Sequence, residues 1–348
     1  MQTSREIVTR ALKFESPERL PREIWRLPWA MDHAAETMRE IDTRWSGDIG
    51  GPANVYRPSK KAQGYMFGAG KATDPWGCVF ENIFPGIHGE VKDPVLKDLN
   101  DWKCIVEAPL EMLPDDYSKA RDAVNRDHAA SDKFMRGGLN PRPWEQYQFF
   151  RGSEEAMMDI IDPDENVLAV LKTLHEFYLR EVEFWVSTDV DAIGFMDDWG
   201  SQRSLLIPPD VWRAIFKPMY KDYIDLAHAA GKFAFMHSDG CIKEIYPDIV
   251  EIGVDALNSQ LFVMDMEQIA NIAKGRLTFW GEIDRQHVLP AKDPQVGRDA
   301  VRKFAKNFYD PSGGIIINFE FGPDSNPDTA IAICEEWDAV HAGIPPAS

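Results

Sequence analysis

The feature of this sequence that most limits its fold is a repeated alternation of short apolar segments with long amphipathic ones, which begins near residue 134. The strand-like segments "VDAIGFMDD" and "KFAFMHSDG" are each followed by a helical pattern, as in "IPPDVWRAIFKPMYKDYIDLAHAAG". Strands that are joined through helices by short connections run parallel, and the helices cover the sheet. The alternation therefore predicts an α/β fold with a parallel sheet.

The number of these units favours a closed barrel over an open sheet. About six β–α units are legible from residue 134 onward, and "PREIWR" and a segment within 60–92 could supply two more. Eight units make a (β/α)8 TIM barrel, for which 348 residues is an ordinary length. A doubly wound open sheet is the alternative, but the glycines of "GYMFGAGKATDPWG" lack the spacing and the context of a phosphate-binding loop.

The whole chain, residues 1–348, is expected to form a single domain. Residues 1–133 make its less regular part, because the segment 45–115 is rich in Gly, Pro and Trp and has weak periodicity. This segment is predicted to form irregular structure with short strands that covers one end of the barrel. Residues 134–348 hold the regular β–α units.

Polar residues end successive predicted strands. In a barrel the carboxyl ends of the strands surround one opening, where the functional site lies. We therefore expect these side chains to line a common pocket. They are Arg26, Asp197, Asp198, His237, Asp239, Asn258, Gln260, Glu282, Asp284, Asn318 and Glu320.

The pair His237 and Asp239 has the spacing of a metal-binding or catalytic pair. Two residues apart at a strand end, both side chains can point to the same side, and imidazole and carboxylate can share Zn²⁺ or a similar ion. Glu320 is the first choice for a third ligand and Cys241 the second. The alternative is that His237 hydrogen-bonds Asp239 or Asp197 and orients a substrate without metal, or packs in the core.

The adjacent Asp197 and Asp198 are expected to divide their roles. One carboxylate could act in acid–base chemistry or bind substrate, and the other could cap the next segment. Asp197 is taken as the catalytic candidate and Asp198 as a substrate-binding one. Trp199 and Trp280 are interpreted as pocket walls or core.

The charge of the chain argues against two classes of partner. The formal net charge is −19, so nucleic acid and anionic membrane surfaces would be repelled. No run of about 18 apolar residues predicts a membrane span, and the N-terminal stretch lacks the apolar core of a signal peptide. The four cysteines are scattered without a CxxC pair. A cytoplasmic location is the expectation.

Several of these segments also resemble the uroporphyrinogen decarboxylase superfamily. The stretch from "IGFMDDWGSQRS" to "VDALNSQ" carries the likeness most strongly, and "TDPWGCVF", "LTFWGEIDRQHVLP" and "GGIIINFE" agree in order. The likeness covers nearly the whole chain. It implies a (β/α)8 barrel and two possible activities, cofactor-free decarboxylation of a tetrapyrrole and corrinoid-dependent methyl transfer.

The decarboxylase motifs are poorly matched. The decarboxylases of this superfamily share an arginine-rich "MRQAGR" stretch that binds substrate carboxylates. The similar stretch of this chain reads "PREIWRLPWAM" and has only Arg22 and Arg26. Asp48 is a weak match to their catalytic aspartate. A substrate with many carboxylates would also meet an acidic pocket in an acidic protein.

The methyltransferase branch matches better at His237. Its thiol-methylating members bind zinc through a His-x-Cys pair and a later cysteine, and this chain has Asp239 and Glu320 in place of the cysteines. A His/Asp/Glu set leaves a harder ion that suits an oxygen better than a thiol. The resemblance thus implies demethylation of a small methoxy compound, with a corrinoid on a partner protein as methyl acceptor, and a possible homodimer. A non-catalytic binding barrel is the third alternative.

Overall fold

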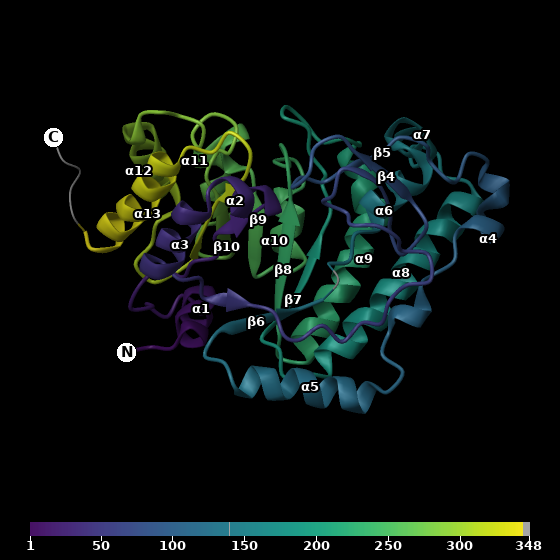
Figure 1. The fold of residues 1–348 in the computed structure, drawn as a ribbon, viewed down its shortest axis with the longest axis horizontal. Helices are drawn as coiled ribbons and strands as arrows, with labels where there is room; N and C mark the ends of the chain where they lie inside the picture. Colours follow the sequence, from purple (N-terminus) through teal and green to yellow (C-terminus); the bar gives the residue numbers. More distant parts are fainter. Residues whose placement is uncertain (139, 344–348) are drawn as a thin grey trace.

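The computed structural model describes residues 1–138 and 140–343, and its centre is a parallel sheet of seven strands in the order β11-β10-β9-β8-β7-β6-β2. The sheet curls, and the helices lie on its outer side (Figure 1). The strands are β2 (Ile49–Gly50), β6 (Phe134–Gly137), β7 (Ala192–Met196), β8 (Phe233–Ser238), β9 (Ala256–Ser259), β10 (Thr278–Glu282) and β11 (Ile315–Asn318). The predicted α/β fold with a parallel, barrel-like sheet is confirmed.

Two further strands lie apart from this sheet. β1 (Trp25–Arg26) pairs in parallel with β12 (Glu320–Phe321). Backbone bonds from Glu23 N to Ile317 O and from Trp25 N to Phe319 O, both 2.9 Å, continue this pairing. The sheet assignment is therefore one sheet of seven strands beside a two-stranded pair, rather than a single sheet of eight strands.

Helices follow the strands as the alternation predicts. The longest, α8 (Glu165–Val186) and α9 (Pro209–Ala229), lie together along one side of the sheet, and α12 (Pro294–Phe308) and α13 (Pro327–His341) along the other (Figure 1). The others are α1 (Ser4–Lys13), α2 (Pro28–His33), α3 (Ala35–Arg44), α4 (Trp102–Ile105), α5 (Tyr117–Ala129), α6 (Pro143–Arg151), α7 (Ser153–Asp159), α10 (Tyr246–Glu251) and α11 (Met266–Ala273). None of the helices in the described residues is both long and apolar enough to cross a membrane.

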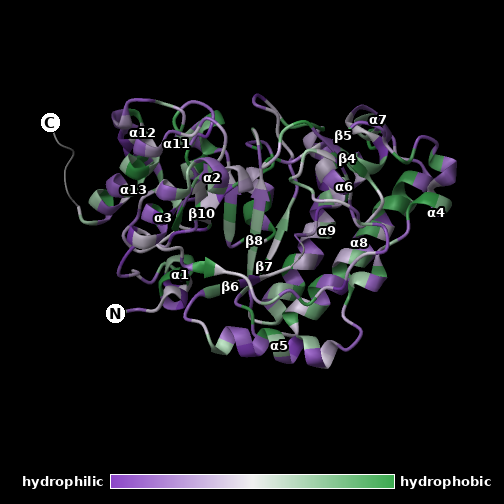
Figure 2. Cartoon of the chain, viewed as in Figure 1, coloured by the Kyte–Doolittle hydropathy of each residue, from purple (hydrophilic) through white to green (hydrophobic). Residues whose placement is uncertain are grey.

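Apolar side chains fill the interior of the curled sheet. Phe134, Phe235, Trp280 and Ile316 meet there, each at most 2% exposed. Val8 of α1 joins this cluster, so the first helix closes the amino-terminal end of the strands. In Figure 2 the central strands are largely hydrophobic, whereas surface helices such as α5 alternate between hydrophobic and hydrophilic residues. Such an alternation along a helix is expected when one face is buried and the other is exposed to solvent.

The segment 45–115 contains a small antiparallel sheet of β3 (Gly70–Thr73), β4 (Val79–Asn82) and β5 (Glu90–Val91). β4 and β5 lie beside α6 (Figure 1). Phe67, Phe80 and His88 of this segment line the main cavity at the carboxyl ends of the parallel strands. The irregular segment thus covers the end of the sheet where the predicted pocket lies.

Candidate functional site

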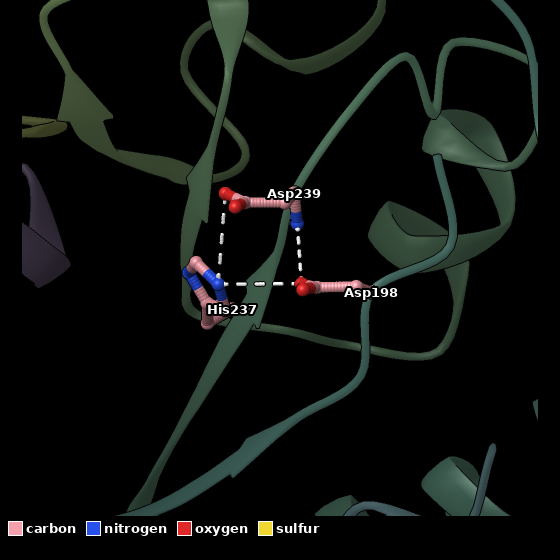
Figure 3. A group of neighbouring side chains, drawn as sticks. All are labelled: Asp198, His237 and Asp239. Carbon is pink, nitrogen blue, oxygen red and sulfur yellow. Dashed lines mark hydrogen bonds and ion pairs between the residues drawn. The ribbon is translucent and has the colours of Figure 1, made fainter. Parts of the chain in front are cut away.

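Asp198, His237 and Asp239 form a compact cluster at the carboxyl ends of two neighbouring strands (Figure 3). His237 is the fifth residue of β8, and the two aspartates follow β7 and β8. His237 Nε2 lies 3.4 Å from Asp198 Oδ1 and 3.7 Å from Asp239 Oδ1. One potential ligand atom from each residue lies within 4.8 Å of the other two. The three side chains can therefore share one cation.

Buried amides fix the orientation of the His237 ring. Asn258 Nδ2 donates to the carbonyl oxygen of Trp280 at 2.9 Å and to Asn318 Oδ1 at 3.1 Å. Its Oδ1 is therefore the acceptor that faces His237 Nδ1 at 2.7 Å. With the proton held on Nδ1, the neutral ring presents the lone pair of Nε2 to the two aspartates. This is the tautomer that a metal ligand requires.

The loops that carry the two aspartates touch through their backbones. Gly200 N donates to Asp239 O at 3.1 Å, and Cys241 N donates to Ser201 O at 2.7 Å. A Cβ on Gly240 would lie 2.0 Å from Gly200 O, and Gly240 has a φ of +80°. Glycine is needed here for both reasons. The close approach sets the spacing of Asp198 and Asp239, and Asp239 N donates to Asp198 Oδ1 at 2.9 Å.

A second group of charges surrounds Arg285. Its guanidinium bonds Asp239 Oδ2, and its Nη1 lies 3.2 Å from Glu282 and 3.5 Å from Glu320. Glu320 thus pairs with Arg285, whereas Asp198 is the acidic group nearest to His237 Nε2, at 3.4 Å compared with 3.7 Å for Asp239. The expected ligand pair of His237 and Asp239 lies together, with Asp198 beside it rather than Glu320.

The cluster opens into a cavity of about 590 Å³. Asp198, His237, Asp239 and Glu320 line it together with Glu145 of α6. Much of the remaining wall is aromatic, with seven Phe and Trp side chains: Trp25, Phe67, Phe80, Phe149, Phe195, Phe235 and Trp280. A mostly apolar cavity of this size with a few convergent polar groups is typical of a small-molecule site.

Burial and neighbouring charges shift the pKa values of the cluster. Burial opposes protonation of His237, but the contact with Asp198 and the charges of Asp239 and Asp198 outweigh it and raise the pKa of His237 to about 10. Burial, reinforced by the charge of Asp198, raises the pKa of Glu145 to about 7. Burial also raises the pKa of Glu282 to about 8 against the opposing charge of Arg285. In the protein without a cation, His237 therefore carries a second proton, on Nε2 between the two aspartates, and a bound cation would take the place of that proton.

Asp197 lies outside the cavity and is fully buried. Its carboxylate accepts hydrogen bonds from the backbone N–H groups of Trp144 and Glu145, at 3.0 and 2.7 Å, and from Tyr220 Oη at 2.5 Å. It thereby ties the start of α6 to the end of β7. Of the adjacent aspartates, Asp198 is the one that reaches the cavity.

Other predicted site residues also lie away from the cavity wall. Arg26 points outward to pair with Asp42, while its neighbour Trp25 lines the cavity. Trp199 is fully buried and donates to Tyr220, and Gln260 accepts from the backbone of Gly240 at 3.1 Å.

Trp280 lines the cavity, and Asn258 lies behind His237. Cys241 is buried outside the cluster of Asp198, His237 and Asp239, and Glu282 pairs with Arg285 with 2% of its side chain exposed.

Four charged residues line the cavity in addition to those expected from the sequence: Arg136, Arg142, Glu145 and Arg285. Arg285 follows the strand-ending residues Glu282 and Asp284 in "GEIDR", so its position was a usable signal. Arg142 and Glu145 follow β6 in "GGLNPRPWE", and they were missed because this strand ends at Gly137, several residues before them. Arg136 lies within that strand and stacks on Trp280.

Fold and site together define an α/β barrel-like protein whose pocket, at the carboxyl ends of its strands, has an aromatic wall and charged groups of both signs. The sequence profile described as "Uroporphyrinogen decarboxylase (URO-D)" matches residues 143–340, more than half of the chain. The chain therefore belongs to the uroporphyrinogen decarboxylase family. No curated protein matches the sequence significantly.

Solved structures of two other proteins are similar to this chain. A methyltransferase from Methanosarcina mazei is 14% identical, with a TM-score of 0.65 over 98% of this chain and 100% of that one. A B12-independent methionine synthase from Shewanella sp. W3-18-1 is 9% identical, with a TM-score of 0.49 over 94% and 96% of the two chains. The first of these similarities establishes a shared fold.

Proposed function

We propose that this protein is a methyltransferase that takes a methyl group from a small O-methyl compound and passes it to a corrinoid, with a divalent cation held by Asp198, His237 and Asp239. One observation carries the proposal. His237 Nε2, with its lone pair set by Asn258, faces two aspartate oxygens at the wall of an aromatic cavity.

The distances within the cluster fit a small cation. Ligands at about 2.0–2.2 Å around a tetrahedral zinc ion lie about 3.3 Å apart. The separations of Nε2 from the two aspartate oxygens, 3.4 and 3.7 Å, are close to that value and long for hydrogen bonds. Asp239 Oδ1 is also buried without a hydrogen-bond partner among the described residues. A cation would satisfy this oxygen.

The chemistry of the donors favours an oxygen-linked methyl group. One imidazole and two carboxylates are harder ligands than the thiolates that suit a thiol substrate. A divalent ion bound here would supply Lewis acidity toward the ether oxygen, and the corrinoid would supply the nucleophile that accepts the methyl group.

The residues of this chain would handle the departing oxygen and exclude water. When the C–O bond breaks, the oxygen keeps the electron pair and needs a proton. Glu145 lines the cavity, and with its pKa raised to about 7 by burial it is largely neutral below that pH and can donate one. The aromatic wall keeps the reacting methyl group away from bulk water.

Family membership and the fold shared with a methyltransferase agree with this proposal. Uroporphyrinogen decarboxylation is the weaker candidate. Arg22 and Arg26 pair with Asp338 and Asp42 rather than facing the cavity, and Asp48 is buried against Arg19. These groups are not placed to grip or react with a tetrapyrrole in the cavity.

We also infer that residues 22–26 act as the eighth strand of a closed barrel. Their backbone bonds to residues 317–321 are matched on the other side by Asp48 N, which donates to Arg22 O at 2.8 Å next to β2. This segment would join both edges of the seven-stranded sheet.

The proposed function is tested by methyl transfer to reduced cobalamin. Protein loaded with Zn²⁺ or Co²⁺ is mixed with Co(I) cobalamin and a panel of methanol, methoxyphenols and methoxybenzoates, and methylcobalamin is followed by absorbance. We expect transfer from at least one donor and a loss of at least about 100-fold in His237→Ala, with no loss in the exposed control Arg276→Gln. Absence of transfer from every donor, or formation of coproporphyrinogen from uroporphyrinogen, would overturn the proposal.

A further inference from the structure

Arg142 differs from every other arginine in residues 1–138 and 140–343. Each of the others is either exposed to solvent or paired with an acidic side chain, as Arg136 is with Glu23 and Arg285 with Asp239. Arg142 is partly buried and has no acidic oxygen of the described residues within 4.0 Å, although its charge acts on Glu145 in the same cavity. In a chain with 57 acidic and 38 basic residues, such an arginine is unusual. A partly buried cation without a partner is costly unless an anion reaches it.

The position of Arg142 identifies where that anion would come from. Arg142 lines the main cavity of about 590 Å³ and also a neighbouring cavity of about 390 Å³. Phe80, His88 and Phe149 line both as well, whereas His237, Asp198 and Asp239 line only the first. Arg142 therefore lies on the side of the main cavity that adjoins the second one.

The wall around Arg142 is shaped for a flat apolar group. The rings of Phe80 and Phe149 meet edge to face with centroids 5.0 Å apart, and His88 meets Phe80 at 5.6 Å. Aromatic rings prefer such edge and offset contacts with further rings. An aromatic ligand in the main cavity would find complementary surfaces here and a guanidinium beside them.

We propose that Arg142 binds the carboxylate of the substrate, and that the substrate is an aromatic monocarboxylate. The guanidinium offers a planar pair of N–H donors that matches a carboxylate in a bidentate contact. The two other guanidinium groups of the cavity are already paired, Arg136 with Glu23 and Arg285 with Asp239, so Arg142 is the one left to bind the anion and thereby orient the ring. This assignment rests on the proposed function. Together they make the methyl donor a methoxybenzoate whose methoxy group faces the cluster of Asp198, His237 and Asp239.

Binding measurements without cobalamin test this assignment. Calorimetric titration of the metal-free protein compares 4-methoxybenzoate with 4-methoxybenzamide, which has nearly the same shape but no charge. We expect the wild type to prefer the benzoate at least tenfold, and Arg142→Gln to lose about ten- to a hundredfold in benzoate affinity while its benzamide affinity changes less than about threefold. Arg142→Lys keeps the charge without the planar fork and retains part of the preference. Arg276→Gln, on the surface, leaves both affinities unchanged.

The result that overturns the assignment is a wild type without preference for the benzoate, or an Arg142→Gln protein that keeps it. A melting temperature measured for each variant shows that it is folded. The outcome is separable from the methyl-transfer proposal. An Arg142-dependent preference without methyl transfer from any donor refutes that function and leaves this assignment standing. Methyl transfer from neutral donors without any carboxylate preference does the reverse.

Discussion

At the scale of single residues, the orientation of the His237 ring depends on Asn258, which lies behind it and outside the cavity wall. Asn258 holds its Nδ1, and Asn258 is itself held by the carbonyl of Trp280 and by Asn318, whose Nδ2 donates to Glu23 O at 2.6 Å. This chain of amides crosses the interior of the barrel-like sheet. Groups of this kind orient a metal-binding histidine and commonly change metal affinity tenfold or more when they are removed.

Replacement of Asn258 should therefore weaken cation binding. Asn258→Ala frees the His237 ring to rotate, so we expect Zn²⁺ affinity to fall by about ten- to a hundredfold in competition with a chelating dye. Ser259→Ala is a matched control, because Ser259 is equally buried on the same strand and its hydroxyl has only a 3.4 Å contact with Tyr246. Equal affinities of the wild type and Asn258→Ala would show that the amide does not orient the ring.

Glu282 should make the stability of the metal-free protein depend on pH. Its pKa is about 8 when folded, because burial outweighs Arg285, and near the ordinary 4.5 when unfolded. Between these values the folded state keeps a proton that the unfolded state loses, so this group lowers stability as pH rises from about 4.5 to about 8 and has a constant effect above.

Glu282→Gln removes this titration. We expect the variant to gain on the order of 1–3 kcal/mol relative to the wild type between pH 4.5 and pH 8.5, measured by urea unfolding in the presence of a chelator. A difference between the two proteins that does not change with pH would show that Glu282 is ionised in the folded state throughout.

At the scale of elements, the site lies where the loops that follow β7 and β8 contact each other through their backbones. Asp197 anchors the start of α6 behind this point, and the contact of Gly200 with Gly240 fixes the distance between the loops in front. Asp198, next to Asp197, and Asp239, next to Gly240, are thereby both held close to His237 (Figure 3).

A side chain at Gly240 should disturb this junction. In Gly240→Ala the new Cβ would collide with the Gly200 backbone, so we expect a loss of about 2–4 kcal/mol in stability and a clear loss of cation affinity. Gly231→Ala is the control, because Gly231 also has a positive φ, +71°, but has no atom within 4 Å of the added Cβ. It should cost only about 1 kcal/mol and leave cation binding intact. Similar effects of both substitutions would argue against the loop contact as the cause.

The order of strands and helices could be predicted from the sequence, but the direction in which individual side chains point could not always be predicted. Successive residues of a strand face opposite sides, so an error of one position exchanges the inside for the outside. This is why Trp25 rather than Arg26, and Asp198 rather than Asp197, reach the cavity. The amide chain behind His237 and the ion pairs of Arg285 depend on packing between strands far apart in sequence, which no local pattern encodes.

At the scale of the whole molecule, the parallel sheet brings residues from distant parts of the chain to one opening, and the segment 45–115 covers it. That arrangement followed from the alternation of strands and helices, because parallel strands end on the same side. The covering segment adds Phe67, Phe80 and His88 to the wall of the cavity, and its weak periodicity gave no basis for placing these side chains.

Titration of the metal-free protein with Co²⁺, followed by visible absorption, tests the central claim most directly. Binding of one equivalent, with bands from nitrogen and oxygen ligands, no thiolate charge-transfer band, and loss of the spectrum in His237→Ala and Asp239→Asn, is the result predicted here. A spectrum that survives both substitutions, or a wild-type protein that takes up no Co²⁺, would contradict a cation site at Asp198, His237 and Asp239.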